Sequence, residues 1–166
     1  FVAWVPLLLA ADRYLRAPRE VRPRHWLPTV YLAMFLWNAC TTFWLGLVDE
    51  PWGTRLISGG FPMVANSVLM VLPWWIYRAT HRRLGPRFAP VALVVSWLTF
   101  EHLHYDWDLQ WPWLTLGNVF AVRTGWVQWY EWTGALGGSL WVWVVNLLVF
   151  QGVLAFRQGR QGLAKR

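Results

Sequence analysis

The chain has 166 residues, of which 57% are hydrophobic and only 14% are charged. Soluble domains usually carry about a quarter charged residues, so this composition excludes an ordinary soluble protein. The single cysteine, Cys40, excludes an internal disulfide and a multi-cysteine metal site. The net charge of +7 could suggest nucleic-acid binding, but the distribution of the charges along the chain has a different explanation.

The apolar residues are grouped into segments of the length that a membrane-spanning helix needs, about 20 residues. In chain order, we predict a half-span at residues 1–11 and full spans at 29–48, 56–77, 88–103 and 134–156. None of these segments alternates apolar and polar residues as a membrane β-strand does, so helices are expected. The segment at 88–103 is short. The sequence therefore predicts one all-α, polytopic transmembrane bundle over residues 1–166.

Residues 1–11 would form a helix of roughly 16 Å, about half of a bilayer. They lack an initiator Met, a basic leading region and a small-residue cleavage site, so they do not resemble a signal peptide. We therefore expect that the chain begins inside a helix and is a fragment of a longer protein.

Basic residues are concentrated in alternate loops. Five arginines lie between 13 and 24, four lie between 78 and 87, and four basic residues follow 156. The other loops hold most of the acids, namely Asp49, Glu50, Asp106, Asp108 and Glu131. This alternation is typical of membrane proteins whose basic loops face the cytoplasm. It accounts for the positive charge without nucleic acid.

Residues 104–133 are predicted to form an aromatic-rich connector on the opposite, outer face. Trp and Tyr rings favour the headgroup layer, where the ring and its polar edge are both satisfied. The candidate lipid-binding residues of the connector are Trp111, Trp113, Trp129 and Tyr130. An aromatic belt without any binding role would have the same composition, so both interpretations stay open at this point.

Two acidic residues are further candidates for substrate or lipid binding. Glu101 lies at the outer end of a span and would share a helical face with His104, Tyr105 and Asp108. It could bind an amine, or it could be an interfacial residue hydrogen-bonded to its neighbours. Glu131 could contact a substrate, although a solvated acid at a helix start is the simpler interpretation.

The residues His102, His104, Asp106 and Asp108 alternate along the chain. Alternating ligands share a face only in a strand, whereas the preceding pattern is helical. No second histidine cluster completes a ligand shell. We therefore predict no metal site and no cofactor.

Polar and small residues within the spans have packing roles in this interpretation. Interhelical hydrogen bonds are expected from Asn38, Asn66 and Asn146, and Cys40 is expected to be a small packing residue. Close approach of backbones is expected at 134–139, where glycines and a serine gather.

Several motifs resemble the membrane part of bacterial apolipoprotein N-acyltransferases. They are Trp-Pro-Trp-Leu-Thr-Leu-Gly-Asn at 111–118, Val-Gln-Trp-Tyr-Glu at 127–131 and a segment at 133–139 that ends in Gly-Gly-Ser. The Trp-Asn pair and the Thr-Thr-Phe-Trp run within 37–44 are also similar. The resemblance covers most of the chain, and it favours a lipid-binding groove over a simple aromatic belt at Trp113.

The resemblance implies an eight-helix enzyme of the bacterial inner membrane with a nitrilase-like domain on the periplasmic side. Such enzymes transfer an acyl chain from a phospholipid to the N-terminal S-diacylglyceryl cysteine of lipoproteins. A Glu–Lys–Cys triad forms the thioester intermediate. The present spans would correspond to the end of helix two through helix six.

The family's triad cannot be assembled from this chain, so no catalytic residue is predicted and the fragment should be inactive alone. Cys40 lies within a span, and Lys165, the only lysine, lies in a predicted cytoplasmic tail. The expected role is a membrane platform and lipid entrance. Its partners would be a phospholipid acyl donor, a diacylglyceryl apolipoprotein and the absent nitrilase-like domain. One alternative is a non-catalytic anchoring or assembly module. A small transporter is less favoured, because transporters are expected to carry charged residues near the middle of the bilayer.

Overall fold

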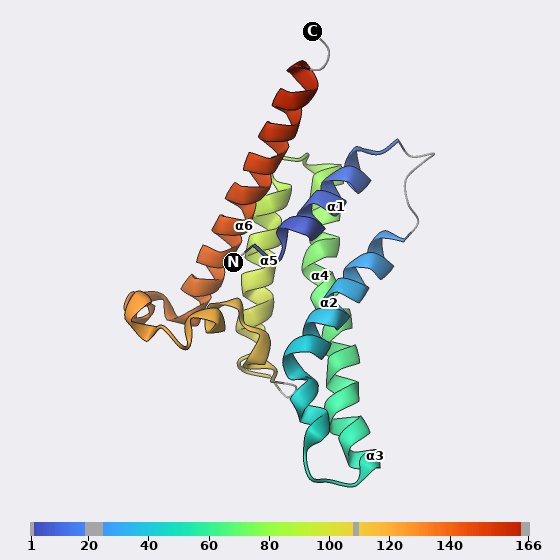
Figure 1. The fold of residues 1–166 in the computed structure, drawn as a ribbon, viewed down its shortest axis with the longest axis vertical. Coiled ribbons are helices and arrows are strands. Elements are labelled where there is room, and N and C mark those ends of the chain that lie inside the picture. The colour runs from blue at the N-terminus through green and yellow to red at the C-terminus, as the bar shows by residue number, and fades with distance from the viewer. Residues whose placement is uncertain (1, 19–24, 108–109, 164–166) are drawn as a thin grey trace.

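The computed structural model describes residues 2–18, 25–107 and 110–163, and all regular secondary structure in these ranges is helical (Figure 1). The predicted all-α class is therefore confirmed. The helices are α1 (Val5–Arg16), α2 (Trp26–Thr42), the short α3 (Trp52–Arg55), α4 (Phe61–Arg83), α5 (Ala89–Leu103) and α6 (Tyr130–Leu163).

Three helical stretches of the described chain are long and apolar enough to cross a membrane, namely Trp26–Leu47, Trp52–Arg83 and Tyr130–Gly159. They contain most or all of the predicted spans 29–48, 56–77 and 134–156. Two of them are not purely α-helical, because Phe43–Leu47 is a 3-10 turn and Leu56–Gly60 is a π-helical turn. The fourth apolar helix, α5, is shorter, as the sequence led us to expect. The chain is a membrane protein.

Several helix boundaries differ from the prediction: α2 begins at Trp26, α4 continues to Arg83 and α6 continues to Leu163. The first helix does not stop at residue 11 but continues to Arg16, where the Arg16 guanidinium pairs with Asp12 one turn earlier at 2.7 Å. The last helix begins at Tyr130 and is interrupted at Gly134, whose φ of 61° is a left-handed conformation that glycine adopts readily. The break at Gly134 falls at the start of the predicted span 134–156, and residues 130–133 form a separate helical turn that leads from the connector into it.

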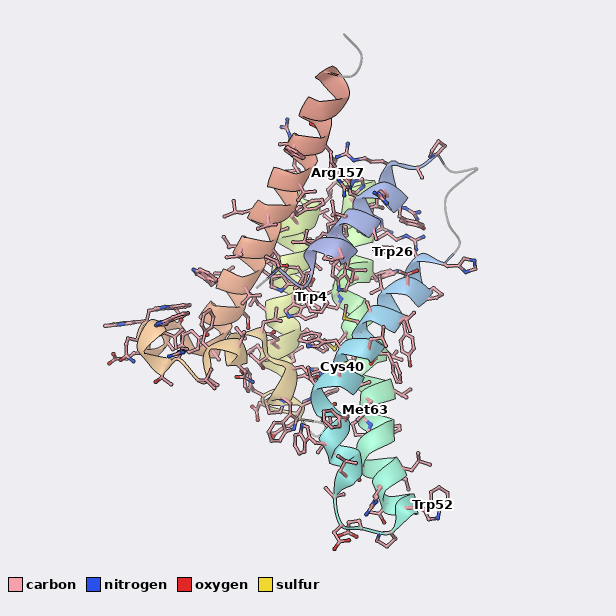
Figure 2. The ribbon with its side chains drawn as sticks, viewed as in Figure 1. Trp4, Trp26, Cys40, Trp52, Met63 and Arg157 are labelled. Carbon is pink, nitrogen blue, oxygen red and sulfur yellow. The ribbon has the colours of Figure 1, made fainter. Side chains whose placement is uncertain are left out.

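The long helices run up and down the long axis of the molecule, and α1 lies across them (Figure 1). α4 packs against both α2 and α5, α5 packs against α6, and α1 contacts α6 and α2. The arginine-bearing ends of α1, α4 and α6 lie at one end of the bundle, and α3 and the connector lie at the other. Figure 2 shows Arg157 toward the first end and Trp52 at the tip of the second. The loop charges are thus separated along the bundle axis.

The centre of the bundle is a cluster of five tryptophans, one from each of the helical segments α1, α2, α4, α5 and α6. These are Trp4 at the start of α1, Trp37 on α2, Trp74 on α4, Trp97 on α5 and Trp143 on α6. The ring of Trp4 has its centroid 4.7 to 6.3 Å from those of the other four. Contacts at such distances are favourable for aromatic pairs, so this cluster holds the helices in a fixed arrangement.

The expected interhelical hydrogen bonds of the three asparagines are confirmed. Asn66 Nδ2 on α4 donates to Asn38 Oδ1 on α2 at 2.8 Å. Asn146 Oδ1 on α6 accepts the backbone N–H of Trp4 at 2.9 Å. Cys40, in contrast, is exposed on α2, so the prediction that it packs inside the bundle is wrong. Neighbouring Asn38 takes the inward position instead.

Candidate functional site

An open apolar groove of about 750 Å³ lies between α1, α2, α6 and the connector. The helices contribute Leu7, Trp37 and Val142 to its walls, and the connector contributes Trp113 and Leu116. Polar groups in the walls are few, so the groove suits an apolar ligand. Its volume lies within the usual range of small-molecule sites.

Trp113 belongs both to the wall of this groove and to the molecular surface. The 3-10 turn Pro112–Leu114 carries it, and Leu114 and Leu116, which follow it, are buried. Its own side chain is 56% exposed, and its ring meets the ring of Trp44 edge-on at 5.4 Å. The turn therefore fixes the backbone while leaving the indole accessible to a ligand.

Glu101 is buried at the end of α5, with only 3% of its surface exposed. Its Oε1 accepts hydrogen bonds from Trp97 Nε1 at 2.8 Å and from the backbone N–H of Leu116 at 2.9 Å. Oε2 has no hydrogen-bond partner among the described residues. The carboxyl group therefore links α5 to the connector three residues after Trp113.

The predicted helical face of Glu101, His104, Tyr105 and Asp108 is not formed. α5 ends at Leu103, so the positions that follow lie in a turn. The His104 ring packs against Phe100 and Trp107, and Tyr105 is exposed. Asp108 lies outside the described residues.

The connector also packs directly on the first turns of α6. Tyr130 Oη donates to the carbonyl of Gly117 at 2.9 Å, and the Gly117 N–H donates to Ser139 Oγ at 2.9 Å. A Cβ atom on Gly117 would overlap the carbonyl of Ala135, and one on Gly138 would overlap the Tyr130 hydroxyl. The close approach expected at 134–139 is therefore confirmed, but the partner is the connector and not another helix.

The remaining predicted residues lie away from the groove. Trp111 is partly buried and lines a second cavity together with residues of α4. Trp129 is half-buried, donates its indole N–H to the Trp126 carbonyl at 3.2 Å and packs edge-on against Tyr130. Glu131 is exposed in the first turn of α6. Glu101 and Tyr130 thus both form hydrogen bonds to the backbone just after Trp113, at Leu116 and Gly117.

The sequence interpretation missed the groove walls that helices contribute, such as Trp37, Thr41 and Asn146. No local signal marks them, because α2 and α6 bring them together from distant parts of the chain. Within the described ranges, no three His, Cys, Asp or Glu residues form a group that could hold a metal ion.

Membrane-length helices, a separation of charge between the two ends and an aromatic connector beside an apolar groove define a polytopic membrane protein. The protein-family model described as apolipoprotein N-acyltransferase N-terminal domain matches residues 1–148. The chain therefore belongs to this family, and the resemblance read from the sequence is confirmed.

An apolipoprotein N-acyltransferase from Chlorobaculum tepidum is similar to this chain. The two are 28% identical over 149 residues, which is 90% of this chain and 26% of the relative. The chain thus spans about a quarter of the length of that enzyme and corresponds to its membrane part. No solved structure matches the chain.

Proposed function

We propose that this chain is the membrane platform and lipid entrance of an enzyme that acylates lipoproteins. The reaction would move an acyl chain from a phospholipid to the N-terminal S-diacylglyceryl cysteine of an apolipoprotein. The apolar groove that Trp113 helps to line carries the proposal, since it could hold an acyl chain beside an accessible indole. The single domain over 1–166 would serve this one purpose.

The other connector residues would contribute at the rim of this entrance. Trp111, Trp129, Tyr130 and Glu131 are proposed contacts for lipid or lipoprotein on the outer surface. Glu101 would act indirectly, by positioning the connector, because its carboxyl group accepts a hydrogen bond from the backbone N–H of Leu116.

The chain alone would be inactive. Acyl transfer through a thioester needs a thiol that a neighbouring base activates. Cys40 is exposed on membrane helix α2, and the only lysine of the chain, Lys165, is far from it in sequence. We propose that a nitrilase-like domain of the complete enzyme supplies the Glu–Lys–Cys triad and is positioned by this platform.

The proposed orientation places the arginine-rich end in the cytoplasm and the connector in the periplasm of a bacterial inner membrane. The distribution of basic loops supports it. Lipoproteins would then meet the groove on the outer surface.

The test is acyl transfer by the complete enzyme that contains these residues, with Trp113→Ala compared with Trp132→Ala. Trp132 is 86% exposed and lines neither cavity, so it is a matched control. Losing an aromatic anchor costs about 1–2 kcal/mol of binding, so we expect kcat/KM to fall about tenfold for Trp113→Ala only. Equal activity of the two variants would remove Trp113 and the groove from the proposal.

A further inference from the structure

Three side chains from three helices meet at the arginine-bearing end of the bundle. The rings of Trp26, at the start of α2 (Figure 2), and of Tyr14 on α1 are stacked, with centroids 5.2 Å apart and an interplanar angle of 16°. The guanidinium carbon of Arg78 on α4 lies over the Tyr14 ring, 5.5 Å from its centroid. A cation is attracted to the face of an aromatic ring, and both rings are buried, so they hold this guanidinium in place.

Arg78 forms no ion pair with an acid among the described residues. Its side chain is partly buried, and α4 contains no acid. The acid of α1, Asp12, is paired with Arg16 at 2.7 Å. By sequence, the undescribed residues 19–24 add three arginines and one glutamate, so they leave the excess of positive charge in place. A partly buried cation without a counter-ion is costly, which favours an anionic ligand at this position.

The surface of α4 on either side of Arg78 has an order that suits a phospholipid. Trp75 is exposed one turn before Arg78, and Arg82 is exposed one turn after it. Residues three or four positions apart lie on the same side of a helix. This side of α4 therefore passes from an apolar surface at Trp75 to two arginines near the end of the helix. A phospholipid has the same order, with its phosphate above its acyl chains.

We propose that Arg78 and Arg82 bind the phosphate of an anionic phospholipid in the leaflet at the arginine-bearing end. A guanidinium donates two parallel N–H bonds to phosphate oxygens, and the acyl chains lie along α4 beside Trp75. A zwitterionic lipid also brings an ammonium group, which the surrounding arginines repel. The site lies at the other end of the bundle from the connector and does not depend on the proposed acyl transfer.

Exposed arginines also attract anionic lipid without forming a defined site, and the neighbours Arg82 and Arg83 separate these two cases. Both are exposed in the last turn of α4, and replacing either one removes a single positive charge. Consecutive residues of a helix are turned by about 100° from one another, so Arg83 leaves the side of α4 that carries Arg78. Arg83→Gln is therefore the matched control for Arg82→Gln.

The experiment is native mass spectrometry of the complete gene product that contains these residues, after exchange with equal amounts of phosphatidylglycerol and phosphatidylcholine that have the same acyl chains. We expect the wild-type protein to retain phosphatidylglycerol preferentially. Arg78→Gln and Arg82→Gln should each lower this preference about tenfold, because each loses charge-assisted hydrogen bonds. Arg83→Gln should change it by less than about twofold.

Two outcomes would overturn the proposal: no preference for phosphatidylglycerol in the wild-type protein, or equal effects of Arg82→Gln and Arg83→Gln. Circular dichroism checks that the variants are folded. Because Arg82 is exposed, its replacement tests the site even if Arg78→Gln does not fold.

Inorganic phosphate offers the same oxygen atoms as the lipid headgroup, so the measurement is repeated with inorganic phosphate in excess. We expect phosphatidylglycerol to stay bound, because its acyl chains also contact α4. If inorganic phosphate displaces the lipid from the wild-type protein, the site belongs to a soluble phosphate and the assignment to a lipid is wrong. Lipid retention is measured without acyl transfer, so these outcomes are independent of the proposed function.

Discussion

At the scale of single residues, Glu101 shows how burial changes the meaning of a carboxyl group. An acid at the end of an apolar helix is a natural candidate for binding an amine. In the structure its Oε1 is instead occupied by two N–H donors, one from α5 and one from the connector. The carboxyl group therefore orders the segment that carries Trp113, and any effect on lipid binding would pass through that segment.

Replacing Glu101 by Ala and by Gln separates this positioning role from direct binding. Alanine leaves two buried donors without an acceptor, and the free energy of unfolding should fall by about 2–4 kcal/mol. Glutamine keeps an acceptor oxygen, so its stability and its acyl transfer should stay close to those of the wild-type protein. Unfolding by SDS titration in mixed micelles measures the first quantity. If glutamine abolishes transfer while leaving stability intact, the negative charge itself is needed and the positioning role is insufficient.

At the scale of elements, the connector is held by backbone packing as much as by its aromatic side chains. Gly117 lies against Ala135 so closely that no side chain fits between them. Both backbone groups of Gly117 are hydrogen-bonded to α6, since its carbonyl accepts from Tyr130 Oη and its N–H donates to Ser139 Oγ. The break at Gly134 leaves the first turn of α6 free to follow the connector instead of the helix axis.

A methyl group at position 117 should therefore displace the connector. In Gly117→Ala the new Cβ meets a backbone carbonyl, which cannot rotate away, and overpacking of this kind costs about 1–3 kcal/mol. The control is Gly125→Ala in the same connector, where nothing lies within 4 Å of the added atom. Limited proteolysis of reconstituted protein should cut the connector faster in Gly117→Ala only. Equal rates in the two variants would show that the contact with α6 does not hold the connector.

At the scale of the whole molecule, charge and aromatic residues occupy opposite ends of one bundle. The tryptophan cluster fixes the helices relative to one another. The arginine-bearing end and the aromatic end therefore keep a fixed position relative to each other. Under the proposed function, this arrangement would keep the mouth of the groove at a constant depth in the bilayer. The orientation of the bundle would then decide from which compartment a ligand reaches the groove.

The orientation can be tested with single cysteines in a Cys40→Ser background. We expect Trp126→Cys, in the connector, to react with a membrane-impermeant maleimide on intact spheroplasts. Arg83→Cys, at the arginine-rich end, should react only after permeabilisation, because basic loops are retained in the cytoplasm. Both positions are exposed in the structure, so burial cannot account for a missing signal. The reverse labelling pattern would place the groove on the cytoplasmic side.

The sequence by itself determined the helical class, the approximate spans, the separation of charge and the family, because these depend on composition, on segment length and on local motifs. It also located the connector and the three interhelical asparagines, whose polarity is conspicuous within apolar helices.

Only the tertiary structure decided which residues meet. Trp37 and Asn146 line the same groove although more than a hundred positions separate them in the sequence, and no local pattern encodes their proximity. Asn38 and not its neighbour Cys40 faces inward because the rotation of α2 is set by packing against α4. Glu101 became a buried link for the same reason, since its partner at Leu116 is brought to it only when the connector folds back over α5.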